Sequence, residues 1–132
     1  MREIKLPSES VLKIYPAPFS DAKALYQSLL KELKQVPVDS KMEVGELYKQ
    51  LFCLGFSSPE IEKCLWACMA RCTYNSGNGD LKIEKDTFEP VEARGDFMQV
   101  CIEVAKENVL PFVKSLYAEY QRLLHTAEKP QL

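Results

Sequence analysis

The sequence has no surplus of basic residues and no long apolar run. Its 17 lysine and arginine residues are outnumbered by 19 aspartate and glutamate residues, and the formal net charge is −2. Because the chain has no excess of cations to neutralise phosphates, we expect no nucleic-acid partner. No apolar run approaches the roughly 20 residues that span a bilayer, and the opening MREIKLPSES lacks the apolar stretch of a secretory signal. We therefore expect an intracellular, soluble protein with no membrane partner.

The residues from which catalytic and cofactor sites are commonly built are also scarce. There is no glycine-rich phosphate motif, and the single histidine, His125, has no serine or cysteine at a spacing that indicates a nucleophilic pair. The stretch from Asn75 to Asp86 has Asp80 at its sixth position, where a calcium loop needs glycine. These absences predict a protein that is not an enzyme and that holds no cofactor and no metal.

Three of the five cysteines recur at four-residue intervals in CLWACMARC, residues 64–72. At about 100° per residue, Cys64, Cys68 and Cys72 fall in one apolar sector of a helix, where cysteine behaves as a small hydrophobe. A shared zinc ion needs every sulfur at ~2.3 Å, whereas Cys64 and Cys72 are about 12 Å apart along a helix axis. The spacing therefore predicts core packing, and a metal-dependent module that uses Cys64 and Cys68 is the alternative.

The chain contains no internal repeat and no low-complexity linker, so we expect one domain, residues 1–132. Apolar and polar side chains alternate on both sides of Pro7-Ser8-Glu9, which predicts a β-hairpin in residues 1–18. The rest, residues 20–126, is predicted to form a helical body. The expected fold class is therefore α+β, mainly α, with an N-terminal β-hairpin followed by a bundle of four to five helices.

Helical periodicity is found in four segments, residues 20–36, 44–54, 58–74 and 88–124. The third begins with Ser58-Pro59, which places proline at the first helical position. The fourth changes its apolar face near Pro111, so we expect a kink or a new helix start there. A straight helix that touches two different neighbours is the alternative. Leu81-Lys82-Ile83 is a further candidate for a short strand.

The last third of the chain is rich in carboxylates, which are interspersed with Arg94 and Lys106. Such mixed charges are typical of a solvated helix face. The carboxylates predicted to lie on this face are Glu89, Glu92, Asp96, Glu103 and Glu107. Glu103 and Glu107 are one helical turn apart, so they either repel each other or pair across an interface.

Three stretches of the sequence together resemble a known family. They are LPSESVLKIYPAPFSDAKALYQSLL (6–30), GFSSPEIEKCLWACMARCTY (55–74) and DTFEPVEARGDFMQVCIEVAKENVLPFVKSLYAEYQ (86–121). Over almost its whole length the chain is similar to the small tail assembly chaperones of long-tailed bacteriophages and prophages. The segment EARGDFMQVCIEVAKENVLPF, with Asn108 and Pro111-Phe112 near its end, carries most of the likeness.

This resemblance implies a non-catalytic function in the cytoplasm of the bacterial host. Such chaperones bind the long, helical tape measure protein and keep it soluble while the tail tube polymerises around it. They are absent from the mature virion, and self-association along the client is compatible with this function. The alternative is a permanent structural component of the phage tail or head–tail joint.

A groove between helices, lined by apolar and aromatic side chains, would receive an amphipathic client helix. Trp66 lies about 120–140° from the cysteine sector of its helix, so it either packs against a second helix or anchors a partner. The candidate partner-binding residues are Trp66, Phe112, Leu116, Tyr117 and Tyr120.

Overall fold

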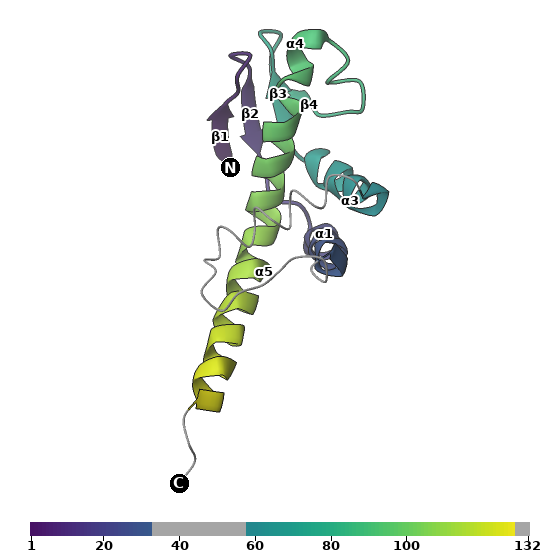
Figure 1. Ribbon diagram of the computed structural model, residues 1–132. Coiled ribbons are helices and arrows are strands. Elements are labelled where there is room, and N and C mark those ends of the chain that lie inside the picture. The colour runs from purple at the N-terminus through teal and green to yellow at the C-terminus, as the bar shows by residue number, and fades with distance from the viewer. Residues whose placement is uncertain (33–57, 129–132) are drawn as a thin grey trace.

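The structure, a computed structural model, describes residues 1–32 and 58–128 (Figure 1). The helix predicted in residues 44–54 lies outside the described residues. Within them the chain forms four strands and four helices, which are in order β1 (Arg2–Lys5), β2 (Val11–Ile14), α1 (Phe19–Glu32), α3 (Pro59–Met69), β3 (Thr73–Asn75), β4 (Leu81–Lys82), α4 (Val91–Arg94) and α5 (Phe97–Glu128).

The four strands form one antiparallel sheet in the order β1-β2-β3-β4. The predicted hairpin strands are present as β1 and β2, with Ile4 opposite Leu12. The predicted fold class is nevertheless wrong, because the hairpin is not a separate unit that precedes a helical bundle. β3 pairs with the second edge of β2, with Tyr74 opposite Leu12, and β4 extends the sheet beyond β3.

β3 occupies the place where the cysteine spacing predicted the end of a helix. α3 ends at Met69, so Cys72 follows the helix and Thr73 and Tyr74 lie in a strand. Threonine and tyrosine favour strands because branched and aromatic side chains pack well on a pleated surface. Leu12 of β2 is fully buried, so the backbone groups of that strand need hydrogen-bonding partners on both edges. The pairing of β3 with β2 joins residues far apart in the sequence, so the four-residue spacing of the cysteines does not predict it.

α5 is the central element of the fold and extends along the whole molecule in Figure 1. β2 contacts it on one side, while α1 and α3 pack against each other and against its other side. Val100, Val104 and Val109 of α5 are completely buried. The buried Asn108 accepts a hydrogen bond from the backbone N–H of Ala17 at 2.8 Å, which fixes the segment between β2 and α1.

α1 and α3 each bury one face toward α5. Ser58 caps α3, since its Oγ accepts a hydrogen bond from the Ile61 N–H at 3.4 Å, and Pro59 occupies the first turn as predicted. Leu25 and Leu29 of α1 are buried in the same core as Ile61. The two helices therefore form an apolar wall against which the first half of α5 packs.

The first strand is attached to α5 by ion pairs. Arg2 donates from Nε to the Glu107 carboxylate at 3.0 Å and from Nη2 to the Glu103 carboxylate at 2.9 Å. One guanidinium group bridges two carboxylates that are one helical turn apart. Glu103 and Glu107 therefore pair across the strand–helix contact and do not form part of a simple solvated face.

Pro111 lies inside α5, so no new helix begins there. The two apolar stripes therefore belong to one continuous helix, as in the alternative prediction. Only the start of the second stripe packs against a neighbour among the described residues: Phe112 stacks on α1, whereas Leu116, Tyr120 and Leu123 are exposed. Proline has no N–H to donate to the carbonyl of Glu107, and its ring crowds that carbonyl. Pro111 itself is exposed, so no buried contact offsets this cost.

Replacing Pro111 with alanine should therefore stabilise the fold. We expect the Pro111→Ala variant to raise the free energy of unfolding by about 1–3 kcal/mol, because alanine restores the missing hydrogen bond. Urea denaturation followed by circular dichroism measures this value. The control is Lys114→Ala, an exposed position in the next turn, which should change stability by less than about 0.5 kcal/mol. A loss of stability in Pro111→Ala would contradict the expectation.

Candidate functional site

The second half of α5 carries a row of exposed apolar side chains. From residue 114 to residue 123 no side chain of α5 is fully buried. Leu116, Tyr120 and Leu123 are exposed to 39%, 41% and 60%. At about 100° per residue these three and Phe112 lie within a sector of about 80°. We call Phe112, Leu116, Tyr120 and Leu123 the α5 stripe.

The α5 stripe begins at the contact between α5 and α1. Phe112 is half-buried and stacks on Tyr26 of α1, with ring centroids 5.0 Å apart and planes at 16°. Phe19 at the start of α1 lies 5.9 Å from the same ring and is 68% exposed. The stripe therefore extends from an anchored aromatic contact onto the exposed half of the helix.

The five candidate partner-binding residues do not form one surface. Phe112, Leu116 and Tyr120 share the α5 stripe. Tyr117 lies about 60° further around the helix and is half-buried against the core. Trp66 is elsewhere: its ring lies 6.0 Å from Phe97, which precedes Phe112 by about 22 Å along the axis of α5.

Trp66 belongs to an aromatic cluster at the start of α5. Its ring is tilted against Phe88 and Phe97, and Phe88 also meets Tyr74 edge to face. The indole Nε1 donates to the Glu62 carboxylate at 3.5 Å. Trp66 therefore packs against a second part of the chain, which was one of the two predicted roles.

Four cysteines lie among the described residues, and all four are free thiols. Cys68 and Cys72 are fully buried, which confirms core packing for these two, while Cys64 is half-buried at the edge of the core. Burial raises the pKa of the Cys68 thiol to about 12 and that of the Cys101 thiol to about 12, from an ordinary value of 9.0. Neutral, buried thiols of this kind are poor nucleophiles.

Asp96 does not lie on a solvated helix face. It immediately precedes α5 and is 0% exposed. Its carboxylate accepts hydrogen bonds from the Ser8 N–H at 3.0 Å, the Ser8 hydroxyl at 2.5 Å and the Tyr74 hydroxyl at 2.7 Å. The partial positive charge at the N-terminus of α5 also favours a carboxylate at this position. The prediction of a solvated Asp96 is therefore wrong, because the hairpin turn and β3 cover it.

The sequence contained one signal that Asp96 is buried. Asp96 lies four and eight residues before Val100 and Val104, which places it on the buried stripe of the same helix. Its donors, Ser8 and Tyr74, are 88 and 22 residues away in sequence, so their identity had no local signature.

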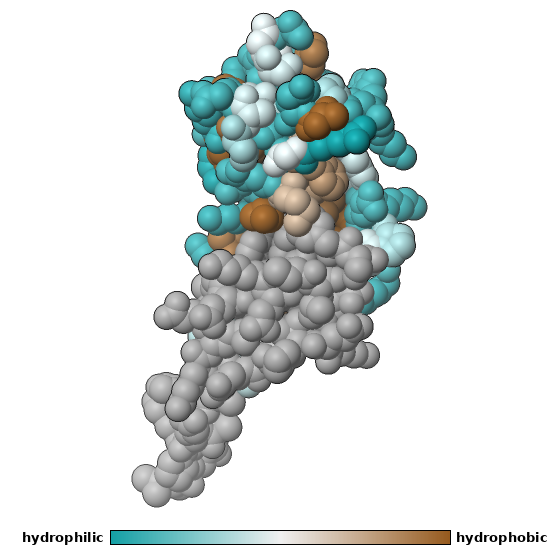
Figure 2. Space-filling model, turned by 45° about the horizontal axis from the view of Figure 1, so that its top comes forward, coloured by the Kyte–Doolittle hydropathy of each residue, from teal (hydrophilic) through white to brown (hydrophobic). Residues whose placement is uncertain are grey.

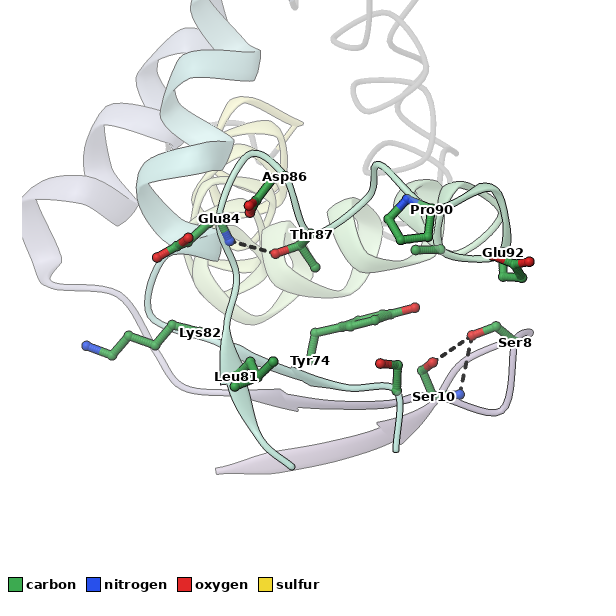
Figure 3. Close-up of a pocket in the computed structure, with 12 residues that line it drawn as sticks. Ser8, Ser10, Tyr74, Leu81, Lys82, Glu84, Asp86, Thr87, Pro90 and Glu92 are labelled. Carbon is green, nitrogen blue, oxygen red and sulfur yellow. Dashed lines mark hydrogen bonds between the residues drawn. The ribbon is translucent and has the colours of Figure 1, made fainter. Parts of the chain in front are cut away.

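Ser8 and Tyr74 also line a cavity of 720 Å³ (Figure 3). The cavity lies between the sheet and the loop that leads from β4 to α4, and hydroxyl and carboxylate groups contribute much of its surface. In the part of the chain that the structure describes, no group of three or more His, Cys, Asp or Glu side chains is placed to hold a metal ion.

Comparisons of the chain with protein-family models, with curated proteins and with solved structures find no match. No helix within the described ranges, 1–32 and 58–128, combines the length and the apolar character needed to cross a membrane.

Removing the Tyr74 hydroxyl should destabilise the fold through Asp96. In Tyr74→Phe the buried carboxylate loses one of three donors, and we expect a loss of about 1.5–3 kcal/mol in the free energy of unfolding. Urea denaturation, followed by the fluorescence of the single tryptophan, measures the loss. Tyr117→Phe makes the same chemical change outside the buried cluster and should cost less than about 0.5 kcal/mol. Equal effects of the two substitutions would contradict a specific role for the Tyr74–Asp96 bond.

The raised thiol pKa values predict a loss of stability at alkaline pH. Above pH 9 the unfolded chain releases the protons of Cys68 and Cys101, while the folded chain retains them until about pH 12. The free energy of unfolding should fall by about 1 kcal/mol per thiol between pH 9 and pH 10. The double variant Cys68→Ala/Cys101→Ala, measured by urea denaturation over this range, should show a shallower fall. An identical slope in both proteins would show that these thiols do not contribute.

Proposed function

We propose that this chain is a non-enzymatic tail assembly chaperone that binds helical segments of a phage tape measure protein and keeps them soluble during tail assembly. The proposal includes action in the cytoplasm of the bacterial host and absence from the mature virion. The resemblance of residues 6–30, 55–74 and 86–121 to such chaperones supports it.

The single structural observation that carries the proposal is the change in the burial of α5 at Val113. Val113 is 2% exposed, whereas Leu116, Tyr120 and Leu123 are all at least 39% exposed. These apolar side chains remain on one face of the helix, at the spacing that a helix uses to pack against another helix. An apolar stripe of this kind is a suitable surface for an amphipathic client helix.

The α5 stripe has features of a surface that could recognise several different helical clients. Tyr120 offers a large apolar ring with a hydroxyl that tolerates water, as aromatic anchors at interfaces commonly do. Phe112 is held in place by its stack on Tyr26, so one end of the stripe is rigid before binding. Lys114 and Glu119 are exposed on the same half of the helix and provide charged surroundings.

A second copy of the chain is a further candidate occupant of the same surface during self-association along the client. The stripe contains only four side chains, fewer than the 20–30 residues per partner of a standard stable interface. Self-association through it alone would therefore be weak, and a client helix bound alongside would add contact area.

A permanent structural component of the tail or head–tail joint is the second candidate function. The four-stranded sheet favours it, since virion tube proteins are usually rich in strands and the structure has two strands more than the hairpin predicted from the sequence. Mass spectrometry of purified particles distinguishes the two candidates, because a chaperone is absent from the particle and a component is present at fixed stoichiometry.

Truncation of the stripe should weaken client binding and leave the fold intact. We expect the double variant Leu116→Ala/Tyr120→Ala to bind a tape measure helix about 10–100-fold more weakly, because both side chains lose apolar contacts at the interface. Fluorescence anisotropy with labelled tape measure peptides measures affinity, and circular dichroism checks the fold.

The matched control is Met98→Ala, which removes a 49% exposed apolar side chain at the other end of α5. Its affinity should equal that of the wild-type chain. If the wild-type chain binds no tape measure segment, the proposed function is wrong; if both variants bind like the wild type, the surface is wrong.

A further inference from the structure

The cavity between the sheet and the loop before α4 has no role in the proposed client binding. Its volume of 720 Å³ is within the range of roughly 300–1,000 Å³ that small-ligand sites occupy. Figure 3 shows Tyr74, Leu81 and Ser10 on the sheet side and Glu84, Asp86 and Thr87 on the loop side. Figure 2 shows one face of the molecule, on which the described surface is mostly hydrophilic with smaller apolar areas between.

The sheet side of the cavity carries hydroxyl groups whose hydrogens are already used. Asp96 accepts from the hydroxyls of Tyr74 and Ser8, because an ionised carboxylate can only accept. The oxygens of Ser8 and Ser10 are 2.8 Å apart, and the one hydroxyl hydrogen of Ser8 points to Asp96, so Ser10 is the donor in that contact. Ser8 Oγ also accepts from the Ser10 backbone N–H at 3.3 Å, so its lone pairs are used as well. The hydroxyl groups of Tyr74 and Ser10 therefore have only lone pairs left for a ligand, and the ligand must supply the donors.

A buried negative charge lies directly behind these hydroxyl groups. Asp96 has three hydrogen-bond donors, but none of the side chains that the structure describes forms an ion pair with it. Three hydrogen bonds and the N-terminus of α5 stabilise this carboxylate, but no counter-ion among the described residues neutralises it, and the field of a charge acts strongly over short distances in a medium of low dielectric constant. A cation in the cavity that Ser8 and Tyr74 line would lie next to the two side chains that donate to Asp96, and this field would attract it.

The charged side chains on the cavity wall also favour a cation. Its lining includes three carboxylates, from Glu84, Asp86 and Glu92, against the single ammonium group of Lys82. Figure 3 shows the ammonium end of Lys82 directed away from the other lining residues, so it does not fill the cavity. Leu81 adds apolar surface that suits a methylene chain.

We propose that this cavity binds an organic cation that donates several hydrogen bonds, an alkylammonium or guanidinium group on an aliphatic stem. The cationic head donates to the lone pairs of Tyr74 and Ser10 and lies one hydrogen bond away from Asp96. The carboxylates of the loop and of α4 attract the cation and contact its outer side. The same chemistry is found in free amines and in lysine or arginine side chains of a protein partner.

Titration of the ¹⁵N-labelled full chain tests the site by NMR. The two probes are agmatine, a free guanidinium compound, and the tripeptide Ac-Gly-Arg-Gly-NH2, which represents a side chain. We expect saturable shifts of the amide signals of Ser10, Tyr74 and Thr87 with at least one probe. Tighter binding of agmatine supports a free cation as the ligand, and tighter binding of the tripeptide supports a partner's side chain. The citrulline tripeptide, a neutral isostere, should bind at least 10-fold more weakly than its arginine counterpart.

Two sets of substitutions locate the charges that matter. The variant Glu84→Gln/Asp86→Asn/Glu92→Gln changes only exposed side chains and should weaken binding at least 10-fold. The control Glu3→Gln/Glu60→Gln/Glu119→Gln removes as many carboxylates away from the cavity and should weaken it less than twofold. The proposal is overturned if neither probe shifts these signals, if citrulline binds equally well, or if both triple variants weaken binding to the same extent.

Discussion

The fold depends on the burial of the first half of α5 between two different surfaces. The sheet covers one side of residues 97–113, and α1 and α3 cover the other. Polar groups then fix the helix against the hairpin: Asp96 accepts from Ser8, and Glu103 and Glu107 pair with Arg2. Burial of apolar side chains supplies most of the driving force for folding, but it would allow α5 to shift along the sheet. The hydrogen bonds and ion pairs specify one alignment of α5 with the hairpin.

Local patterns in the sequence were sufficient to predict the elements that local interactions specify. The hairpin strands, the capped start of α3 at Ser58-Pro59 and the burial of Cys68 all follow from spacing within a few residues. β3 was missed because its strand character depends on pairing with β2, whose partner residues are about 60 positions earlier. The solvent-exposed environment predicted for Asp96 was wrong for the same reason. Its hydrogen-bond donors are distant in the sequence, and its neighbours in the sequence include several other charged residues.

The candidate partner-binding residues show which spatial relations helical periodicity predicts and which it does not. Phe112, Leu116 and Tyr120 share one face because a single helix carries them, and sequence spacing alone gives that relation. Trp66 is on a different helix, so its relation to the other four required the tertiary structure. The sequence alone does not show the role of an aromatic residue that lies off the main apolar stripe. Such a side chain suits packing against a second element in the core and binding of an external partner equally well.

The two surfaces with functional potential are separated by the length of α5. Asp96, beside the cavity, and Leu116, on the stripe, are 20 residues apart, which is about 30 Å along a helix. One surface offers carboxylates and hydroxyl lone pairs, and the other offers apolar and aromatic side chains. Direct Coulomb interaction over 30 Å is largely screened at physiological ionic strength, where the Debye length is about 8 Å. A change in charge at the cavity should therefore leave the stripe unaffected, unless it also changes how α5 is held against the hairpin. The contacts of Ser8 and Tyr74 with Asp96 are the places where such a change would reach the helix, because Ser8 and Tyr74 line the cavity and Asp96 immediately precedes α5.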